Sequence, residues 1–122
     1  MESRTYGCGI EAALDVIGGK WKPIVLWHLA PAPRRLGELR RLVAGISEKM
    51  LIQSLRELEA DGIIARKDFH EVPPRVEYSM TRFGVSLTEA LRPLCEWGGR
   101  HKRRIEVLRD EGGERSVERM VS

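Results

Sequence analysis

The sequence predicts a mainly α-helical fold that carries one small β-hairpin. Hydrophobic residues recur at helical spacing in five segments of the 122-residue chain. Residues Arg75–Met80 alternate between apolar and polar side chains, which predicts a strand, and a Pro-Pro turn separates them from an earlier strand at Ile63–Phe69. Between Ile46 and Thr81 the predicted order is helix, strand, turn, strand and helix start. This is the order of the second half of a winged helix-turn-helix fold.

Three short helices are expected before this segment. Residues 9–17 carry apolar side chains on one face and are followed by Gly18-Gly19, which ends the helix. Pro23 suits the first turn of the next helix, and Ile24–Leu29 is so apolar that we expect this helix to be buried. A third helix is expected from Leu36 to Val43. Its predicted core face consists of Leu36, Leu39, Leu42 and Val43.

The fourth helix has two distinct faces. Ser47 is a favourable N-cap, and Asp61-Gly62 ends the helix. Leu51, Leu55 and Leu58 recur at the i, i+4 and i+7 spacing and should therefore face the core. The opposing face has a cation, an amide, a guanidinium and one apolar side chain. These residues are Lys49, Gln53, Arg56 and Ile52.

A long helix is expected after the hairpin. Thr81 should cap it, and Pro93 and the glycine pair that follows should bend or interrupt it before a further helical segment reaches Asp110. We expect one domain over residues 1–111 and a flexible tail over residues 112–122. The apolar stripe of this helix consists of Leu87, Leu91, Leu94 and Cys95.

Composition excludes several classes of protein. The chain has 21 basic and 18 acidic residues, a net charge of +3, and no apolar stretch near the ~20 residues that span a bilayer. The first residues do not lead into a signal peptide, so we expect a cytoplasmic protein without a membrane partner. The two cysteines and three histidines have no metal-ligand spacing, and no catalytic arrangement of side chains is recognisable. We therefore expect no metal, no cofactor and no enzymatic activity.

The outward face of the fourth helix is suited to duplex DNA. An α-helix fits the major groove, where Arg and Lys match guanine and Gln can pair with adenine. The predicted base-reading residues are Ser47, Glu48, Lys49, Ile52, Gln53 and Arg56. The predicted phosphate-contacting residues are Arg34, Arg35, Arg40 and Arg41, with Arg66, Lys67, His70 and Arg75 of the hairpin. The alternative is an ordinary solvent-exposed face on a winged-helix module that binds a protein rather than DNA.

Cys8 is a candidate thiol sensor. It lies just before the first helix, whose N-terminal amides and dipole favour a thiolate. The alternatives are a small, partly buried packing residue or, least favoured, the nucleophile of a small thiol-dependent enzyme. Cys95 lies on an apolar stripe and is expected to serve packing alone.

From Cys8 to Gly98 the sequence resembles the HxlR-type transcriptional regulators, a bacterial winged-helix family related to the MarR-like repressors. The resemblance rests on Cys8 itself and on five motifs. These are Leu14–Trp21, Pro33–Leu39, Ile46–Leu51, Leu55–Gly62 and Pro73–Tyr78.

The resemblance implies a homodimer formed by the N- and C-terminal helices, which acts on a pseudo-palindromic operator with half-sites roughly 34–36 Å or a multiple apart. It implies a transcriptional regulator, expected to be a repressor, that responds to a small molecule or to oxidant or electrophile modification of Cys8. In some members the cysteine at the position of Cys8 has this sensing role. The family often has Cys-Pro there, whereas this chain has Cys8-Gly9, which loosens the backbone before the helix.

Overall fold

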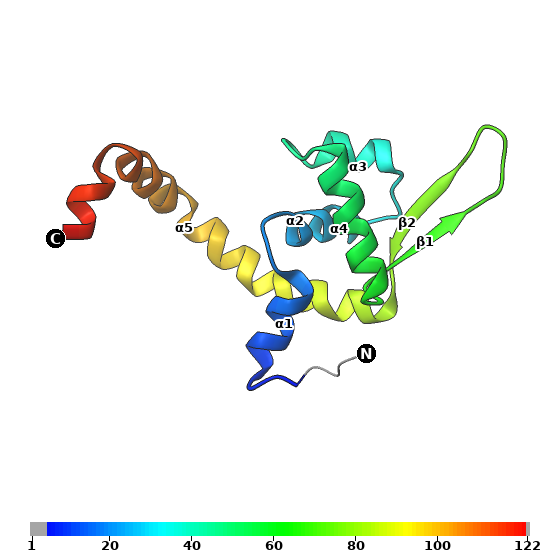
Figure 1. Cartoon of the computed structure of the whole chain (residues 1–122), viewed down its shortest axis with the longest axis horizontal. Coiled ribbons are helices and arrows are strands. Elements are labelled where there is room, and N and C mark those ends of the chain that lie inside the picture. Colours follow the sequence, from blue (N-terminus) through cyan, green and yellow to red (C-terminus); the bar gives the residue numbers. More distant parts are fainter. Residues whose placement is uncertain (1–4, 122) are drawn as a thin grey trace. The chain divides into compact units, whose positions relative to one another are not determined.

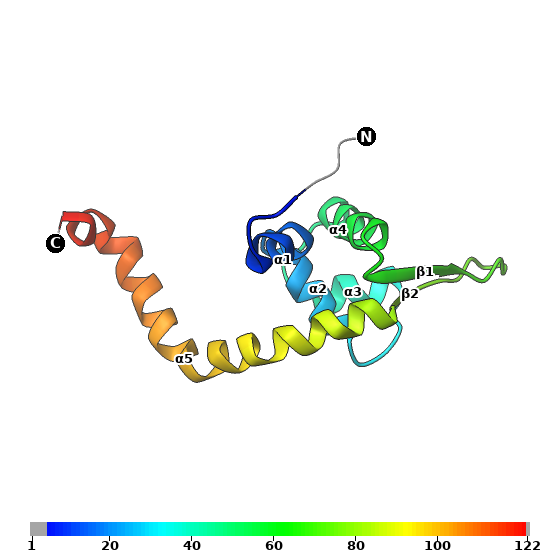
Figure 2. The same cartoon turned by 90° about the horizontal axis from the view of Figure 1, so that it is seen from below.

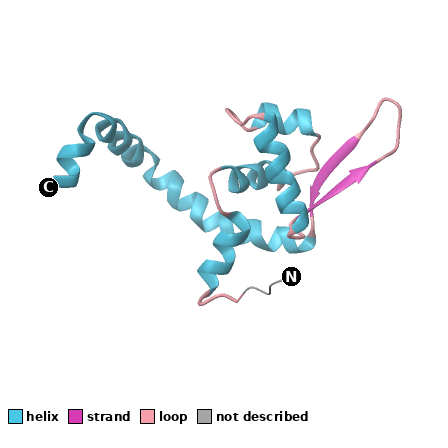
Figure 3. Ribbon diagram, in the orientation of Figure 1, coloured by secondary structure: helices cyan, strands magenta, loops and turns pink. Residues whose placement is uncertain are grey.

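The computed structural model describes residues 5–121, without the side chains of residues 112–121. The chain divides into two compact units, one up to Glu89 and one from Ala90. Most of the chain is helical and one antiparallel hairpin is present (Figure 3), so the predicted fold class is confirmed. In order, the elements are α1 (Gly9–Ile17), α2 (Trp21–Leu29), α3 (Leu36–Leu42), α4 (Glu48–Ala60), β1 (Ile64–Asp68), β2 (Val76–Met80) and α5 (Arg82–Val121) (Figure 1).

Local signals in the sequence account for the helix ends. Ser47 Oγ accepts a hydrogen bond from Met50 N at 3.1 Å, as an N-cap should. Gly62 has a φ of +73°, a left-handed conformation that lets the chain leave α4 and enter β1. Thr81 Oγ1 accepts from Gly84 N at 3.0 Å and donates to Gly62 O at 2.6 Å, so it caps α5 and ties it to the α4–β1 turn.

The approach of α5 to this turn requires a glycine at position 84. A Cβ atom on Gly84 would lie 2.0 Å from the carbonyl oxygen of Ile63. Any other residue there would push the start of α5 away from β1.

One hydrophobic core joins α2, α3, α4 and the base of the hairpin. Leu51, Leu55 and Leu58 of α4 are fully buried, as the i, i+4, i+7 spacing predicts. They pack in a core whose other buried apolar members are Val25, Leu26, Leu29, Leu39, Val43, Ile46, Ile63 and Ile64. The burial of one leucine face fixes which side of α4 is left for solvent.

The hairpin extends beyond the helices of its unit in both views (Figures 1 and 2). Its register pairs Ile64 with Met80 at the base and Asp68 with Val76 at the far end. Arg34 adds one further antiparallel bridge, since its N donates to Tyr78 O at 2.9 Å and its O accepts from Tyr78 N at 2.8 Å. The connection between α2 and α3 therefore lies along the outer edge of β2.

Several side chains expected to be buried are exposed. Trp27 of α2 is 45% exposed and Leu42 of α3 is 40% exposed, because only part of each apolar surface meets the core. On α5, Leu94 and Cys95 are exposed, so the expectation that Cys95 serves packing is wrong within this chain. Periodicity identifies an apolar face but does not show whether the same chain covers it.

α5 is longer and more continuous than expected. It runs from Arg82 to Val121 as one helix with Pro93 inside it, so Pro93 and the following glycines do not interrupt it, and the alternative of a bend stays a prediction. It also passes Asp110, where we expected the last helical segment to end. The mobility of residues 112–122 stays a prediction. Among the described helices, none has the length and apolar character needed to cross a membrane.

Candidate nucleic-acid interface

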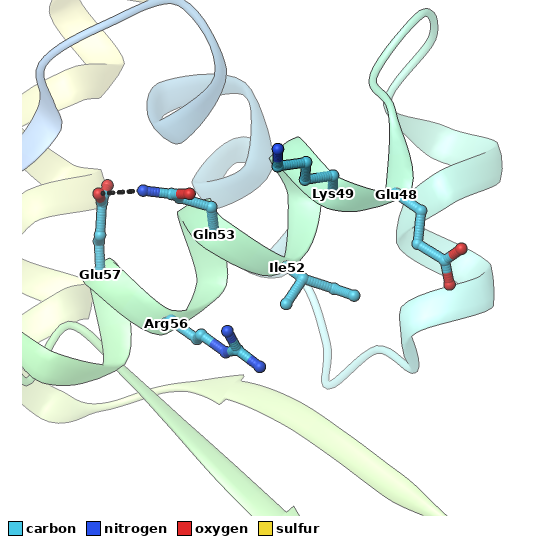
Figure 4. A pocket seen from close by; sticks show the side chains of 6 residues that line it. All are labelled: Glu48, Lys49, Ile52, Gln53, Arg56 and Glu57. Atoms are coloured by element: carbon cyan, nitrogen blue, oxygen red, sulfur yellow. Dashed lines mark hydrogen bonds between the residues drawn. The ribbon is translucent and has the colours of Figure 1, made fainter.

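The outward face of α4 brings most of the predicted base-reading residues together. Lys49, Gln53 and Arg56 are exposed and Ile52 is half-buried, on the side opposite the buried leucines. With Glu48 and Glu57 these side chains line an open depression of about 600 Å³ (Figure 4). Ser47 lies at its N-terminal end, where its hydroxyl oxygen is used in the cap.

The acidic members of this face are paired with cations from neighbouring helices. Glu48 Oε2 lies 3.6 Å from Arg40 Nη1 of α3, and Glu57 Oε2 lies 2.9 Å from Lys22 Nζ of α2. Hydrogen bonds from Lys22 and Gln53, together with the charge of Lys22, hold the pKa of Glu57 below its ordinary value. Two carboxylates on this face are thereby partly neutralised by the fold.

The two basic residues of this face, Lys49 and Arg56, have surroundings that differ from those of Glu48 and Glu57. Within the described part of the chain, neither Lys49 nor Arg56 forms an ion pair or hydrogen bond through its side chain, and both line the depression (Figure 4). Arg and Lys side chains without such a partner can reach guanine O6 and N7 or a phosphate.

The four arginines around α3 have different surroundings. Arg34 Nε donates to His28 O at 3.1 Å, its Nη1 lies 4.0 Å from Glu38, and its backbone pairs with Tyr78, so Arg34 helps to hold α2 and the hairpin together. Arg35 N donates to Glu38 Oε1 at 3.1 Å at the start of α3. Arg40 lies beside Glu48, and Arg41 is exposed.

The hairpin has an aromatic centre that the sequence analysis missed. Phe69 has Lys67 Nζ 4.6 Å and Arg75 Cζ 3.6 Å from its ring centroid, which is cation–π geometry. Arg75 also lies 3.9 Å from Glu71 and 3.7 Å from Glu77, and its Nε is buried without a hydrogen bond. Arg75 is therefore packed within the hairpin. The alternation of Lys67 and Phe69 on one strand face was the signal that could have indicated this centre.

The other hairpin residues that were predicted to contact phosphate are exposed. Arg66 and Lys67 lie on β1, and His70 follows the strand with a φ of +53°. His70 N donates to Asp68 Oδ1 at 2.8 Å, and the His70 side chain is almost fully exposed at the turn. Arg66 and His70 are thus positioned to meet a ligand without rearrangement of the hairpin.

Cys8 occupies the N-cap position of α1. Its backbone is extended and its side chain is exposed. The thiol is accessible to a reagent, in contrast to the alternative of a partly buried packing residue. Over the described residues, no three His, Cys, Asp or Glu side chains gather as a metal site would require.

Comparison with known proteins decides the family. The sequence model described as HxlR-like helix-turn-helix matches residues 16–106, which is most of the chain and includes the whole of α4 and of the hairpin. The chain belongs to the HxlR-like helix-turn-helix family. This confirms the resemblance noted from the motifs.

Relatives and solved structures agree with this assignment. The chain is 52% identical to the HTH-type transcriptional regulator YkvN of Bacillus subtilis (strain 168), over 79% of this chain and 81% of YkvN. It is 50% identical to the regulator YtcD of the same strain, over 86% of this chain and 83% of YtcD. The redox regulator HypR in its reduced form superposes with a TM-score of 0.77 at 45% identity, covering 82% of this chain and 99% of HypR.

The chain is therefore a transcriptional regulator of the helix-turn-helix type. Membership of this family implies DNA binding, and the family and relatives are regulators rather than enzymes.

Proposed function

We propose that this HxlR-family member is a homodimeric, sequence-specific DNA-binding repressor. The observation that carries the proposal is the division of α4 into a buried leucine face and an exposed face with Lys49, Gln53 and Arg56. A helix anchored in this way can enter the major groove with its N-terminal half toward the bases. Arg41, Arg66, Lys67 and His70 then contact phosphates beside the groove, and residues 1–111 act as one cytoplasmic domain.

Exposed apolar side chains support the homodimer. Ile10 and Leu14 of α1 are 63% and 54% exposed, and Leu94 and Trp97 of α5 are 61% and 50% exposed. Large apolar side chains that recur on one helix face are typical of protein interfaces. Two copies joined through these helices would present two recognition helices to a pseudo-palindromic operator.

Cys8 is the proposed input for a signal. Its exposed thiol is accessible to oxidants and electrophiles, and the HypR relative is described as a redox regulator in both reduced and oxidised forms. Modification of Cys8 would lower operator affinity and release repression.

Selection of bound sequences from a random duplex pool tests the proposal. The wild-type protein should enrich two symmetry-related half-sites spaced about one helical turn, or a multiple of it, apart. The enrichment should fall with oxidant present, while Cys8→Ser should enrich the same sequences with or without oxidant. Binding that is insensitive to salt and enriches no sequence would contradict the proposal and favour a protein-interaction module.

A further inference from the structure

A chain of three side chains links α2 to the outward face of α4. Lys22 Nζ lies 2.9 Å from Glu57 Oε2, and Gln53 Nε2 donates to Glu57 Oε1 at 3.2 Å. One oxygen of the Glu57 carboxylate thus contacts the Lys22 ammonium group, and the other accepts a hydrogen bond from the Gln53 amide. The side chain of Lys22 is only 14% exposed, so this series of three contacting side chains starts at a largely buried residue that the fold holds in place.

This arrangement selects one orientation of the Gln53 amide. A glutamine side chain has a donating NH₂ group and an accepting oxygen, and a half-turn about its last torsion exchanges them. Ionised Glu57 accepts hydrogen bonds but cannot donate, so only the NH₂ group can face it. Lys22 holds Glu57 in the ionised form, consistent with the lowered pKa of this carboxyl. The Gln53 oxygen then lies on the side away from Glu57 (Figure 4).

An oriented amide has a preference among bases. In the major groove, adenine and cytosine present exocyclic amines that donate hydrogen bonds, whereas guanine O6 and thymine O4 accept them. An amide with its oxygen toward the groove matches adenine and cytosine. The second hydrogen of the NH₂ group can also reach adenine N7, which favours adenine over cytosine.

We propose that Lys22 and Glu57 are positioning residues that set the base preference of Gln53 toward adenine, then cytosine, and against guanine and thymine. The inference rests on the proposed function, in which α4 reads the major groove. Neither residue needs to touch a base. The Glu57 side chain is 46% exposed, so solvent screens the pair and its effect should appear mainly in selectivity, with the thermal midpoint as the check on folding.

Glu57→Gln is the decisive variant. A neutral amide at this position can present either its oxygen or its NH₂ group to Gln53, so both Gln53 orientations become accessible. Glu59→Gln is the matched control, because it removes the same charge from an exposed site of α4 that lies off the Gln53–Glu57 stripe. Lys22→Met tests the cation, with the thermal midpoint measured to verify folding.

The experiment measures affinity by fluorescence anisotropy for a selected operator and its single-base-pair variants. The position read by Gln53 is defined as the one at which Gln53→Ala loses discrimination. At that position, Glu57→Gln should lower the preference for adenine or cytosine roughly fivefold to tenfold. This is a part of the discrimination between bases that one bidentate side-chain contact provides. Glu59→Gln should not change it, and Glu57→Gln should have no further effect in the Gln53→Ala background.

Two different failures are distinguishable. If Gln53→Ala loses discrimination but folded Glu57→Gln and Lys22→Met keep the wild-type preference, the positioning proposal is wrong and the reading face stands. If Gln53→Ala loses no discrimination at any position, the proposed contact of Gln53 with a base is wrong, and the positioning proposal fails with it.

Discussion

Leu55→Ala should strongly destabilise the fold that holds the recognition helix. Leu55 is 1% exposed and lies between Leu51 and Leu58 on the buried face of α4. Truncation removes a buried side chain and leaves a cavity, which costs about 2–5 kcal/mol in well-packed cores. At about 3 kcal/mol, the midpoint of thermal unfolding should fall by roughly 12–24 °C for a unit of this size.

Arg56→Ala is the matched control for this prediction. Arg56 is the next residue along α4 but is exposed on the outward face, so its free energy of unfolding should change by no more than about 0.5 kcal/mol. Urea unfolding followed by circular dichroism, at one protein concentration for all variants, gives the free energies of unfolding of Leu55→Ala and Arg56→Ala. Equal stability of Leu55→Ala and wild type, or equal destabilisation by Arg56→Ala, would refute the assignment of the two faces.

Three further predictions concern the hairpin, the N-cap of α4 and the ion pair between Lys22 and Glu57. Arg66→Ala should reduce the slope of log affinity against log salt by about 0.9 for each phosphate that the Arg66 side chain neutralises, and an unchanged slope would show that Arg66 meets no phosphate. Ser47→Ala should lower the free energy of unfolding by about 1 kcal/mol because the N-cap hydrogen bond is removed, and no change would contradict that role. Lys22 lowers the pKa of Glu57 in the folded protein. Ionised Glu57 therefore stabilises the fold at pH values above its ordinary pKa of 4.5, and this stabilisation is lost as the pH falls through the lower pKa of the folded state. Carboxyl titration by NMR should show the Glu57 pKa rising in Lys22→Met, and the same pKa in both proteins would refute the pairing.

Local features of the sequence predicted the parts of this fold that depend on neighbours along the chain. The two faces of α4 follow from helical periodicity, and Ser47, Gly62 and Thr81 follow from the requirements of helix ends. A helix face, a cap and a left-handed turn each involve residues within a few positions of one another. Such features can be read from one sequence without knowledge of the tertiary structure.

Contacts between distant segments could not be predicted in this way. Lys22 and Glu57 lie on different helices, and nothing in the periodicity of either indicates that they meet. The backbone pairing of Arg34 with Tyr78 is likewise a tertiary contact, and it gives Arg34 a structural role in addition to its predicted phosphate contact. Trp27 shows the converse error, because an apolar residue on a core helix was expected to be buried.

The most direct measurement of the central claim is the ratio of specific to non-specific DNA binding for Lys49→Ala combined with Gln53→Ala. Both residues are exposed on the outward face of α4, so the variant should fold with near-wild-type stability. If this face reads bases, the ratio should fall by at least about tenfold while non-specific, salt-sensitive binding persists. A folded variant that binds the selected operator with full selectivity would contradict the account.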